Sequence, residues 1–188
     1  MASLKRVHDR AILDALEAID PRPFEGEVWR VTRKDREALC GSSTHGRWSP
    51  SGEFEVLYTS LERDGALAEI GYRLSLEPIW PSRLQHEIHR IEVRTERTLH
   101  IAEFDTLQQL GVDISKYEGF DYEVTQAITA AAHFLAFDGV LVPSARAPCK
   151  NLVLFLDRVP QAGHLVVRQS EPVNWTAWTK DRKPTASR

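Results

Sequence analysis

Residues 46–69 read GRWSPSGEFEVLYTSLERDGALAE and join a loop, a strand and a helix in one continuous segment. The loop is rich in glycine, serine and proline, the strand centres on residues 56–58, and apolar residues recur at helical spacing after residue 64. Arginine and backbone N–H groups in such a loop can bind phosphate, and a tyrosine can stack on a ring. A carboxylate can stabilise positive charge. The segment therefore predicts a site for a phosphorylated molecule that carries a ring.

Length and composition are those of a globular protein with one domain. The chain has 188 residues, of which 42% are hydrophobic and 27% charged, and its formal net charge is -3. This charge gives no electrostatic footprint for nucleic acid. Cys40 and Cys149 are the two cysteines, and the absence of any CxxC or Cys/His array argues against a metal site. No secretory signal or bilayer-spanning run is recognised, so we expect a cytoplasmic location and no membrane contact.

Hydrophobic spacing predicts the secondary structure. Helices are expected at residues 4–19, 64–74, 106–110 and 121–137. Strands are expected at residues 27–31, 55–59, 87–94, 98–102, 140–142 and 151–156. Asp64 is expected to cap the second helix, Gly111 to end the third, and residues 95–97 to form a charged turn. The tail after Trp178 is polar and is expected to fray.

The order of these elements predicts an α+β fold, because helices and strands do not alternate regularly as they do in a doubly wound sheet. We expect an N-terminal helical extension over residues 1–25 and the main domain over residues 26–160. Residues 161–188 are expected to add a C-terminal strand or tail to the same domain.

Three residues of the opening segment are candidates for ligand binding. Arg47 can fork onto phosphate oxygens, and Trp48 can form a wall of the same pocket. The alternative for both is a surface turn whose tryptophan simply packs. Tyr58 offers a flat face to a pyridinium or adenine ring, and the alternative is ordinary packing within a sheet.

Glu69 and Ser144 are candidates for the chemistry. Glu69 lies beside Ala66 and Leu67, at the edge of an apolar stripe, where a carboxylate needs a partner or a chemical role. A solvated position is its alternative. Ser144 follows a buried strand at a proline turn but lacks the Gly-x-Ser-x-Gly elbow, so a hydrolase nucleophile is disfavoured and a turn-capping hydroxyl is the alternative.

Other sequence signals are weaker. His86 and His89 stand three residues apart in a predicted strand, without the HExxH spacing of a metalloprotease helix, and we expect both to be exposed. No GxGxxG or P-loop sequence is present, so neither a Rossmann dehydrogenase nor an NTPase is supported.

An ordered set of short motifs resembles the RES domain, the toxin half of bacterial Xre–RES toxin–antitoxin pairs. The motifs are WRV at 29–31, GRW at 46–48, VLY at 56–58, ALAE at 66–69, PSAR at 143–146 and NLVLF at 151–155. The resemblance covers about Val28 to Phe155 and makes residues 26–160 the RES domain. It implies an ADP-ribosyltransferase-like fold with a split β-sheet core, flanking helices and an extra N-terminal helix. One departure is His45, where the family usually has glycine.

The resemblance also implies the site. It implies NAD as substrate and no metal. Its catalytic residues correspond to Arg30, Glu69 and Ser144, and its NAD-binding residues to Arg47, Tyr58, Trp48 and Asn151. In this scheme Arg30 and Arg47 bind the pyrophosphate, Tyr58 stacks on nicotinamide, and Glu69 faces the developing positive charge on the ribose.

The function so implied is that of a toxin that cleaves the nicotinamide–ribose bond of NAD and depletes NAD by hydrolysis or phosphorolysis. One alternative is a mono-ADP-ribosyltransferase that modifies a specific protein acceptor. Another is a non-catalytic module that binds NAD or a partner. The implied partner is an Xre-type antitoxin that binds DNA itself and covers the cleft. A homodimer remains among the open oligomeric states.

Overall fold

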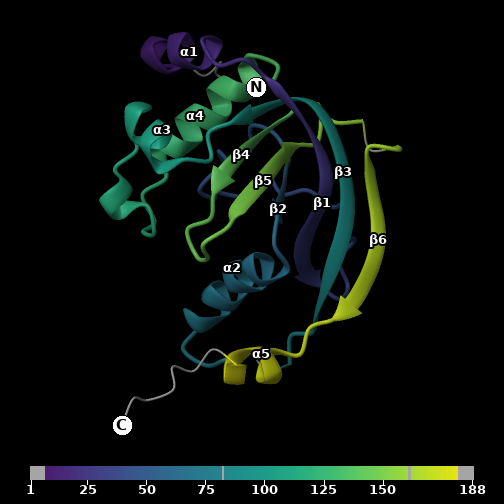
Figure 1. Ribbon diagram of the computed structural model, residues 1–188. Coiled ribbons are helices and arrows are strands. Elements are labelled where there is room, and N and C mark those ends of the chain that lie inside the picture. Colours follow the sequence, from purple (N-terminus) through teal and green to yellow (C-terminus); the bar gives the residue numbers. More distant parts are fainter. Residues whose placement is uncertain (1–6, 82, 161, 182–188) are drawn as a thin grey trace.

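Strands of very different length form the central sheet of this computed structural model, which describes residues 7–81, 83–160 and 162–181 (Figure 1). The strands are β1 (Arg22–Arg33), β2 (Val56–Ser60), β3 (His86–His100), β4 (Gly139–Pro143), β5 (Lys150–Phe155) and β6 (Leu165–Pro172). Within the described residues the order is β1-β2-β5-β4-β3-β6, with a further pairing of β1 and β3. The extra pairing closes the first five strands into a ring, and β6 lies outside it along β3.

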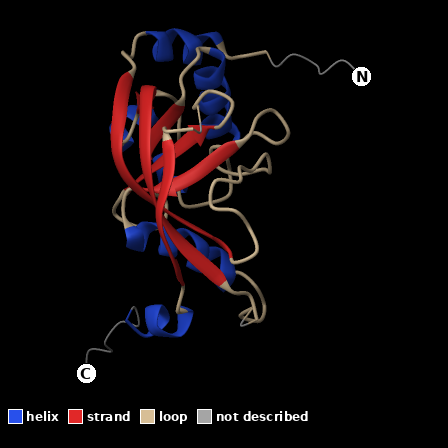
Figure 2. Ribbon diagram, turned by 90° about the vertical axis from the view of Figure 1, so that its right-hand side faces the viewer, coloured by secondary structure: helices blue, strands red, loops and turns tan. Residues whose placement is uncertain are grey.

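Helices occupy both ends of the sheet. They are α1 (Arg10–Glu17), α2 (Arg63–Ser75), α3 (Phe104–Gln109), the 3-10 helix η1 (Ile114–Lys116), α4 (Glu123–Phe134) and α5 (Trp175–Asp181). Figures 1 and 2 place α1, α3 and α4 at one end of the molecule and α2 with α5 at the other. The predicted α+β fold is confirmed. None of the helices in the described ranges is long and apolar enough to cross a membrane.

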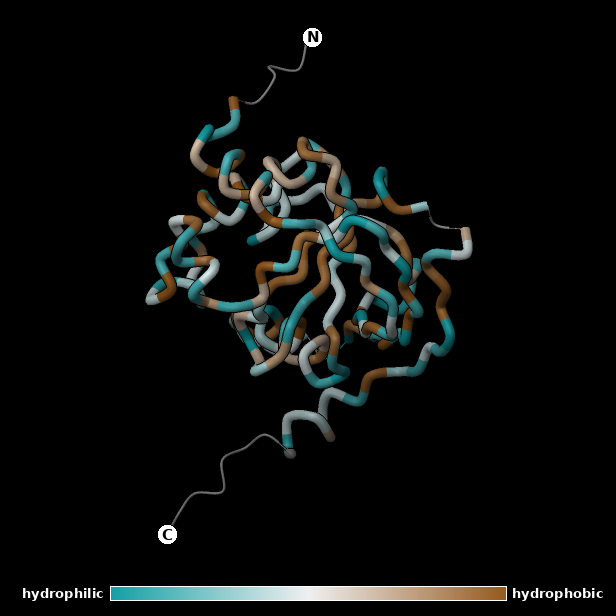
Figure 3. Tube along the Cα trace, turned by 45° about the horizontal axis from the view of Figure 1, so that its top comes forward, coloured by the Kyte–Doolittle hydropathy of each residue, from teal (hydrophilic) through white to brown (hydrophobic). Residues whose placement is uncertain are grey.

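Two of the apolar clusters among the described residues pack the helices against the sheet. One packs α4, and through Leu16 also α1, against the strands that carry Val140 and Val153. The other packs α2 and α5 against β1 and β3 through Leu67, Ile88 and other apolar residues. Figure 3 shows the hydrophobic segments gathered at the centre of the trace. Helix α2 therefore rests on the sheet with its apolar face, which leaves one edge of the helix for polar side chains.

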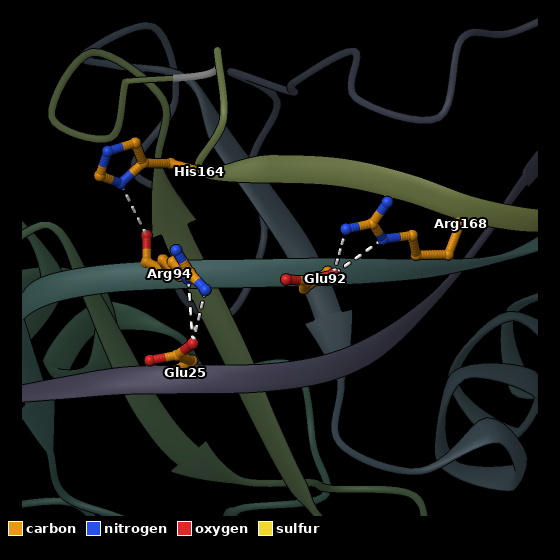
Figure 4. A network of polar contacts seen from close by, with 5 residues as sticks. All are labelled: Glu25, Glu92, Arg94, His164 and Arg168. Carbon is orange, nitrogen blue, oxygen red and sulfur yellow. Dashed lines mark hydrogen bonds and ion pairs between the residues drawn. The ribbon is translucent and has the colours of Figure 1, made fainter.

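The outer face of β1, β3 and β6 is charged. Arg94 pairs with Glu25 across β3 and β1 at 2.9 Å, and Arg168 pairs with Glu92 across β6 and β3 at 2.6 Å (Figure 4). His164 lies beside this network, with Nδ1 3.3 Å from the carbonyl oxygen of Arg94. Ion pairs this exposed contribute about 0–1 kcal/mol each to the free energy of unfolding, so they indicate a solvated face rather than a binding site.

The predicted turn at residues 95–97 is wrong, because strand β3 runs unbroken through these residues. The carboxylate of Asp138 accepts hydrogen bonds from the backbone N–H groups of Glu96 (2.8 Å) and Arg97 (2.7 Å) and from the hydroxyl of Thr98 (3.0 Å). These bonds take the place of a sheet partner where β3 passes from β6 to its parallel pairing with β4. The segment that was predicted to be a turn is therefore a strand whose hydrogen-bond donors are satisfied by Asp138, a buried acid distant in sequence.

Helix boundaries also differ from the prediction. Asp9 caps α1, so the helix begins later than residues 7–9 of the predicted range 4–19, whose residues 4–6 lie outside the described residues. Glu62 occupies the N-cap position of α2 without a side-chain bond, and Asp64 lies in the first turn, so Asp64 is not the cap. Gly111 has φ 91°, as expected for a residue that ends a helix. After Trp178 the chain stays helical to Asp181, and residues 182–188 lie outside the described ranges.

His86 and His89 are buried, not exposed as predicted. Their exposed fractions are 7% and 3%. His89 bridges two strands, with Nε2 2.8 Å from the Thr32 hydroxyl and Nδ1 2.7 Å from the Ser170 hydroxyl. His86 Nδ1 accepts a hydrogen bond from Trp175 Nε1 at 3.1 Å, which fastens α5 to β3. Burial lowers the pKa of both rings. Strands β1 and β6 and helix α5 supply these partners, so the burial of the two rings depends on elements outside their own strand.

Asp138→Ala is expected to lower the free energy of unfolding by on the order of 3 kcal/mol, because it leaves two backbone N–H groups of β3 and the buried hydroxyl of Thr98 without their acceptor. Urea denaturation at neutral pH measures the loss. Asp64→Ala is the matched control, since Asp64 is exposed and makes no hydrogen bond among the described residues; it should change stability by less than about 0.5 kcal/mol. Equal effects for both variants would contradict the role given to Asp138.

Stability is expected to fall as the pH drops below about 6.5, the ordinary pKa of histidine. The pKa values of His86 and His89 are lower in the folded chain than in the unfolded chain, so the unfolded chain binds more protons in this range. His89→Gln should therefore flatten the dependence of the unfolding free energy on pH between about 7 and 5.5. His164→Gln, on the solvated outer face of the sheet, should leave that slope as it is, and an unchanged slope in His89→Gln would exclude the explanation.

Candidate active site

A cleft of about 1300 Å³ opens between α2, strands β1 and β2, and the loop that precedes β2. Its volume exceeds the roughly 300–1,000 Å³ typical of pockets for small ligands, so it has room for an extended molecule. The described residues that line it include Arg30, Arg47, Tyr58, Glu69 and Asn151. Residues predicted from separate motifs therefore meet in one cavity.

Glu69 stands at the centre of this arrangement. Its Oε1 accepts a hydrogen bond from the hydroxyl of Ser144 at 2.8 Å and another from Nδ2 of Asn151 at 3.0 Å. Ser144 directly follows β4 and Asn151 lies in β5, so a helix and two strands converge on one carboxylate oxygen. The solvated alternative for Glu69 does not hold. Both bonds end on Oε1, which leaves Oε2 available to a bound molecule.

Helix α2 can bring Glu69 this close because Gly65 lacks a side chain. A Cβ at Gly65 would clash with Cys149 Sγ and Ser60 Oγ. The first turn of α2 therefore packs directly on β2 and on the turn between β4 and β5. One turn further along, Glu69 comes within hydrogen-bonding distance of Ser144 and Asn151.

Arg30 is buried in the floor of the cleft, with 9% of its surface exposed. Its two terminal nitrogens donate to the carbonyl oxygens of Tyr58 and Cys40, both at 2.9 Å. Burial lowers its pKa to about 10, so the guanidinium stays charged at neutral pH. These bonds tie the loop before β2 to the sheet, and Nε has no partner among the described residues. Arg30 thus supplies positive charge while both of its terminal nitrogens are hydrogen-bonded to the protein.

Arg47 lies between two aromatic rings. Its guanidinium carbon is 4.7 Å from the ring centre of Tyr117 and 4.9 Å from that of Tyr122, and one terminal nitrogen donates to the carbonyl oxygen of Gly119 at 3.0 Å. The two rings fix the plane of the guanidinium, and the remaining N–H groups can still donate to an anion.

Helix α4 holds the loop that carries Arg47. Gln126 Nε2 lies 2.7 Å from the carbonyl oxygen of Gly46, 3.2 Å from that of Ser49 and 3.0 Å from Nδ1 of His45. The hydroxyl of Thr125 donates to the carbonyl oxygen of Arg47 at 2.6 Å. Sequence reasoning missed both residues. A polar pair on the apolar face of a helix was the available signal, and it indicates a buried contact without naming the partner.

Tyr58 and the loop approach each other closely at Gly46. The Tyr58 hydroxyl accepts a hydrogen bond from the backbone N–H of Trp48 at 3.1 Å, and burial raises the pKa of Tyr58. A Cβ at Gly46 would come within 2.7 Å of the Tyr58 hydroxyl oxygen. The Trp48 side chain is 2% exposed and belongs to the apolar core, and Trp48 also borders the cleft.

No metal site is recognised in the part of the chain that the structure describes. No group of three or more His, Cys, Asp or Glu side chains is placed to hold an ion.

The chain is similar to a known family and to two named relatives. The RES domain family matches residues 27–176. A protein named probable NAD(+) phosphorylase Rv3189, from Mycobacterium tuberculosis, is 30% identical over 167 residues, which cover 86% of this chain and 80% of that protein. A second relative, NAD(+) phosphorylase MbcT from Mycobacterium bovis, is 24% identical over 168 residues and covers 86% and 90% of the two chains.

A solved structure shares the fold. It is the crystal structure of the M. tuberculosis MbcT–MbcA toxin–antitoxin complex, with a TM-score of 0.81 and 23% sequence identity. The match covers 92% of this chain and 97% of that chain. The arrangement of helices and sheet is therefore common to both proteins.

Gly46→Ala is expected to lower the free energy of unfolding by about 1–3 kcal/mol, because its Cβ overlaps the hydroxyl of Tyr58. Tyr58→Phe removes that oxygen, so the cost of Gly46→Ala should shrink to less than half when both substitutions are combined. A double-mutant cycle by urea denaturation measures the coupling. Strictly additive effects would contradict the contact.

Proposed function

The chain belongs to the RES domain family, and on this premise we propose that it is an NAD-consuming enzyme that splits the nicotinamide–ribose bond by phosphorolysis. The carboxylate of Glu69, held in the cleft by Ser144 and Asn151, is the observation that carries the proposal. The names of the two relatives support phosphate as the acceptor, since both are NAD(+) phosphorylases, one of them probable.

Phosphorolysis of NAD needs little acid–base help. The bond between ribose C1′ and the nicotinamide nitrogen breaks, its electron pair stays on nitrogen, and nicotinamide leaves as a neutral molecule. An oxygen of phosphate forms the new bond to C1′, which gives ADP-ribose 1-phosphate. The transition state carries positive charge on the sugar, as in glycoside hydrolysis, so one carboxylate beside it is sufficient.

Glu69 is proposed to stabilise this charge through Oε2 while Oε1 stays fixed by the protein. Ser144 and Asn151 are proposed to act as positioning residues: they orient the carboxylate and do not attack the substrate. The amide oxygen of Asn151 is buried and has no partner among the described residues, so it can accept a hydrogen bond from a substrate hydroxyl or amide.

The arginines are proposed to act differently from one another. Arg47 keeps free N–H groups and is placed to bind the diphosphate of NAD. Arg30 already donates through both terminal nitrogens, so we propose that it contributes charge and holds the loop. The ring of Tyr58 lines the cleft and is proposed to stack on nicotinamide, while Trp48 supports the loop from the core.

In the cell we propose that the chain is the toxin of a toxin–antitoxin pair, acts in the cytoplasm, and has an antitoxin protein as partner. The support is the family, together with the shared fold of MbcT, whose crystal structure is a complex with the antitoxin MbcA. No membrane or nucleic acid is part of this proposal.

Glu69→Gln should lower NAD consumption by at least about a hundredfold, because it keeps shape and hydrogen bonds but removes the charge. The assay is chromatography or NMR of purified protein with NAD and phosphate, and circular dichroism checks that the fold is intact. Glu118→Gln, at an exposed position, is the control and should retain full activity. Full activity in Glu69→Gln would exclude the assigned role.

The products decide between reaction types. Formation of ADP-ribose 1-phosphate together with nicotinamide supports phosphorolysis. If free ADP-ribose is the product and NAD is consumed at the same rate without phosphate, the reaction is hydrolysis. Labelled NAD incubated with bacterial lysate tests the alternative of protein modification, because label on a discrete protein band would show transfer to an acceptor.

A further inference from the structure

The walls of the cleft carry more positive than negative charge. Of the described residues that line it, six are arginines and four carry carboxylates. The arginines are Arg30, Arg33, Arg36, Arg47, Arg73 and Arg146. A cleft with this balance concentrates anions, and which arginine binds one depends on which N–H donors the protein leaves free.

Several of these arginines are occupied by the protein itself. Arg30 and Arg36 donate to backbone carbonyl oxygens of residues 40 and 41, and Arg30 also donates to that of Tyr58. Arg47 donates to the carbonyl oxygen of Gly119. These bonds organise the loops around the cleft, and they reduce the capacity of these side chains to bind a ligand.

Arg146 is held in a different way. Its guanidinium carbon lies over the face of the Tyr72 ring, 3.5 Å from the ring centre. In the described parts of the chain its side chain has no hydrogen bond or ion pair. Stacking on a ring fixes the plane of a guanidinium without using its N–H groups, which point outward from the edges of that plane. Arg146 is therefore oriented and still has its donors.

The position of Arg146 relative to Glu69 is fixed by two short paths. The backbone N–H of Arg146 donates to the Ser144 hydroxyl at 3.1 Å, and this hydroxyl donates to Glu69 at 2.8 Å. Tyr72 is three residues after Glu69 on α2, so both lie on one face of the helix. The stacked pair and the carboxylate thus share one wall of the cleft.

We propose that Arg146, stacked on Tyr72, forms a binding site for a phosphate oxyanion beside Glu69. Arg73, exposed on the same helix and lining the same cleft, adds positive charge. The proposal deepens the proposed function and rests on it for the identity of the phosphate. That phosphate is either the inorganic phosphate that attacks C1′ or a phosphate of the NAD diphosphate.

The chemistry explains why such a site is needed next to a carboxylate. Phosphate and the Glu69 carboxylate are both anions and repel each other. A guanidinium with a free bidentate edge can neutralise the phosphate and orient one of its oxygens. For inorganic phosphate, this oxygen then forms the bond to C1′ as the bond to nicotinamide breaks. For the diphosphate, the same contact anchors NAD without taking part in the bond change.

Binding measured without turnover tests the site directly. Isothermal titration calorimetry of the full chain with inorganic phosphate and with ADP, each alone, requires no catalysis. Arg146→Gln should raise the Kd of one of these ligands by about tenfold or more, since it removes a charge-assisted bidentate contact. Arg146→Lys should fall between the wild type and Arg146→Gln, because lysine keeps the charge but not the planar fork.

Substitutions of Tyr72 distinguish the effect of the Arg146–Tyr72 contact on binding from the effect of losing a positive charge. Tyr72→Phe keeps the aromatic face and should bind within about twofold of the wild type, whereas Tyr72→Leu should weaken binding several-fold. Arg168→Gln is the control, because this arginine pairs with Glu92 on the outer face of the sheet (Figure 4) and should leave binding unchanged. If Arg146→Gln fails to fold, the Lys variant and the two Tyr72 variants still decide the question.

Kinetics identify the ligand. A rise confined to the KM for phosphate assigns the site to inorganic phosphate, and a rise confined to the KM for NAD assigns it to the diphosphate. Unchanged binding of both ligands together with unchanged KM values in Arg146→Gln would overturn the proposal. If the wild type bound phosphate through Arg146 but did not consume NAD, the proposed function would fail while the oxyanion site remained.

Discussion

One oxygen of the Glu69 carboxylate accepts hydrogen bonds from Ser144 and Asn151, and this shared acceptor ties helix α2 to strands β4 and β5. Hydrogen bonds to a charged acceptor are stronger than those between neutral groups, by about twofold. The two donors sit at the ends of strands that are themselves buried and paired along their length. The carboxylate is thus placed by the rigid part of the fold, although it lies on a helix at the edge of a cleft.

The second organising feature is a set of arginines that pair with carbonyl oxygens and aromatic rings in place of carboxylates. Arg30 is buried on two backbone acceptors, Arg47 lies between two tyrosines, and Arg146 stacks on one. A salt bridge would neutralise each guanidinium, whereas a ring or a carbonyl orients it and preserves its charge. The protein therefore keeps these cations in place without neutralising their charge.

How much of this could be predicted depends on whether a residue's neighbours are close in sequence. Glu69 was identifiable because a carboxylate at the edge of an apolar stripe is a local anomaly, and helix α2 and strand β5 follow from local spacing. The partners of Glu69 were predicted only from the RES resemblance, since nothing in local spacing joins Ser144 to Glu69.

The continuous path of β3, by contrast, could not be predicted, because it depends on Asp138, which lies 42 and 41 residues away from the two backbone N–H groups that it satisfies. Gln126 and Tyr72 look like ordinary positions in their helices, and they acquire roles only when α4 meets the loop at Gly46 and when α2 meets the turn after β4.

Uncompensated cations in a cleft have a thermodynamic consequence for the whole domain. Burial lowers the pKa of Arg30, because desolvation of the guanidinium in the folded chain disfavours its charged form. An anion bound in the cleft offsets the cost of that desolvation in the folded state and is absent from the unfolded one. Binding must therefore stabilise the fold by linkage, to a degree set by ligand concentration relative to Kd. The features that would make the cleft a good site for a phosphorylated substrate are thus the ones that leave the empty protein less stable than the filled one.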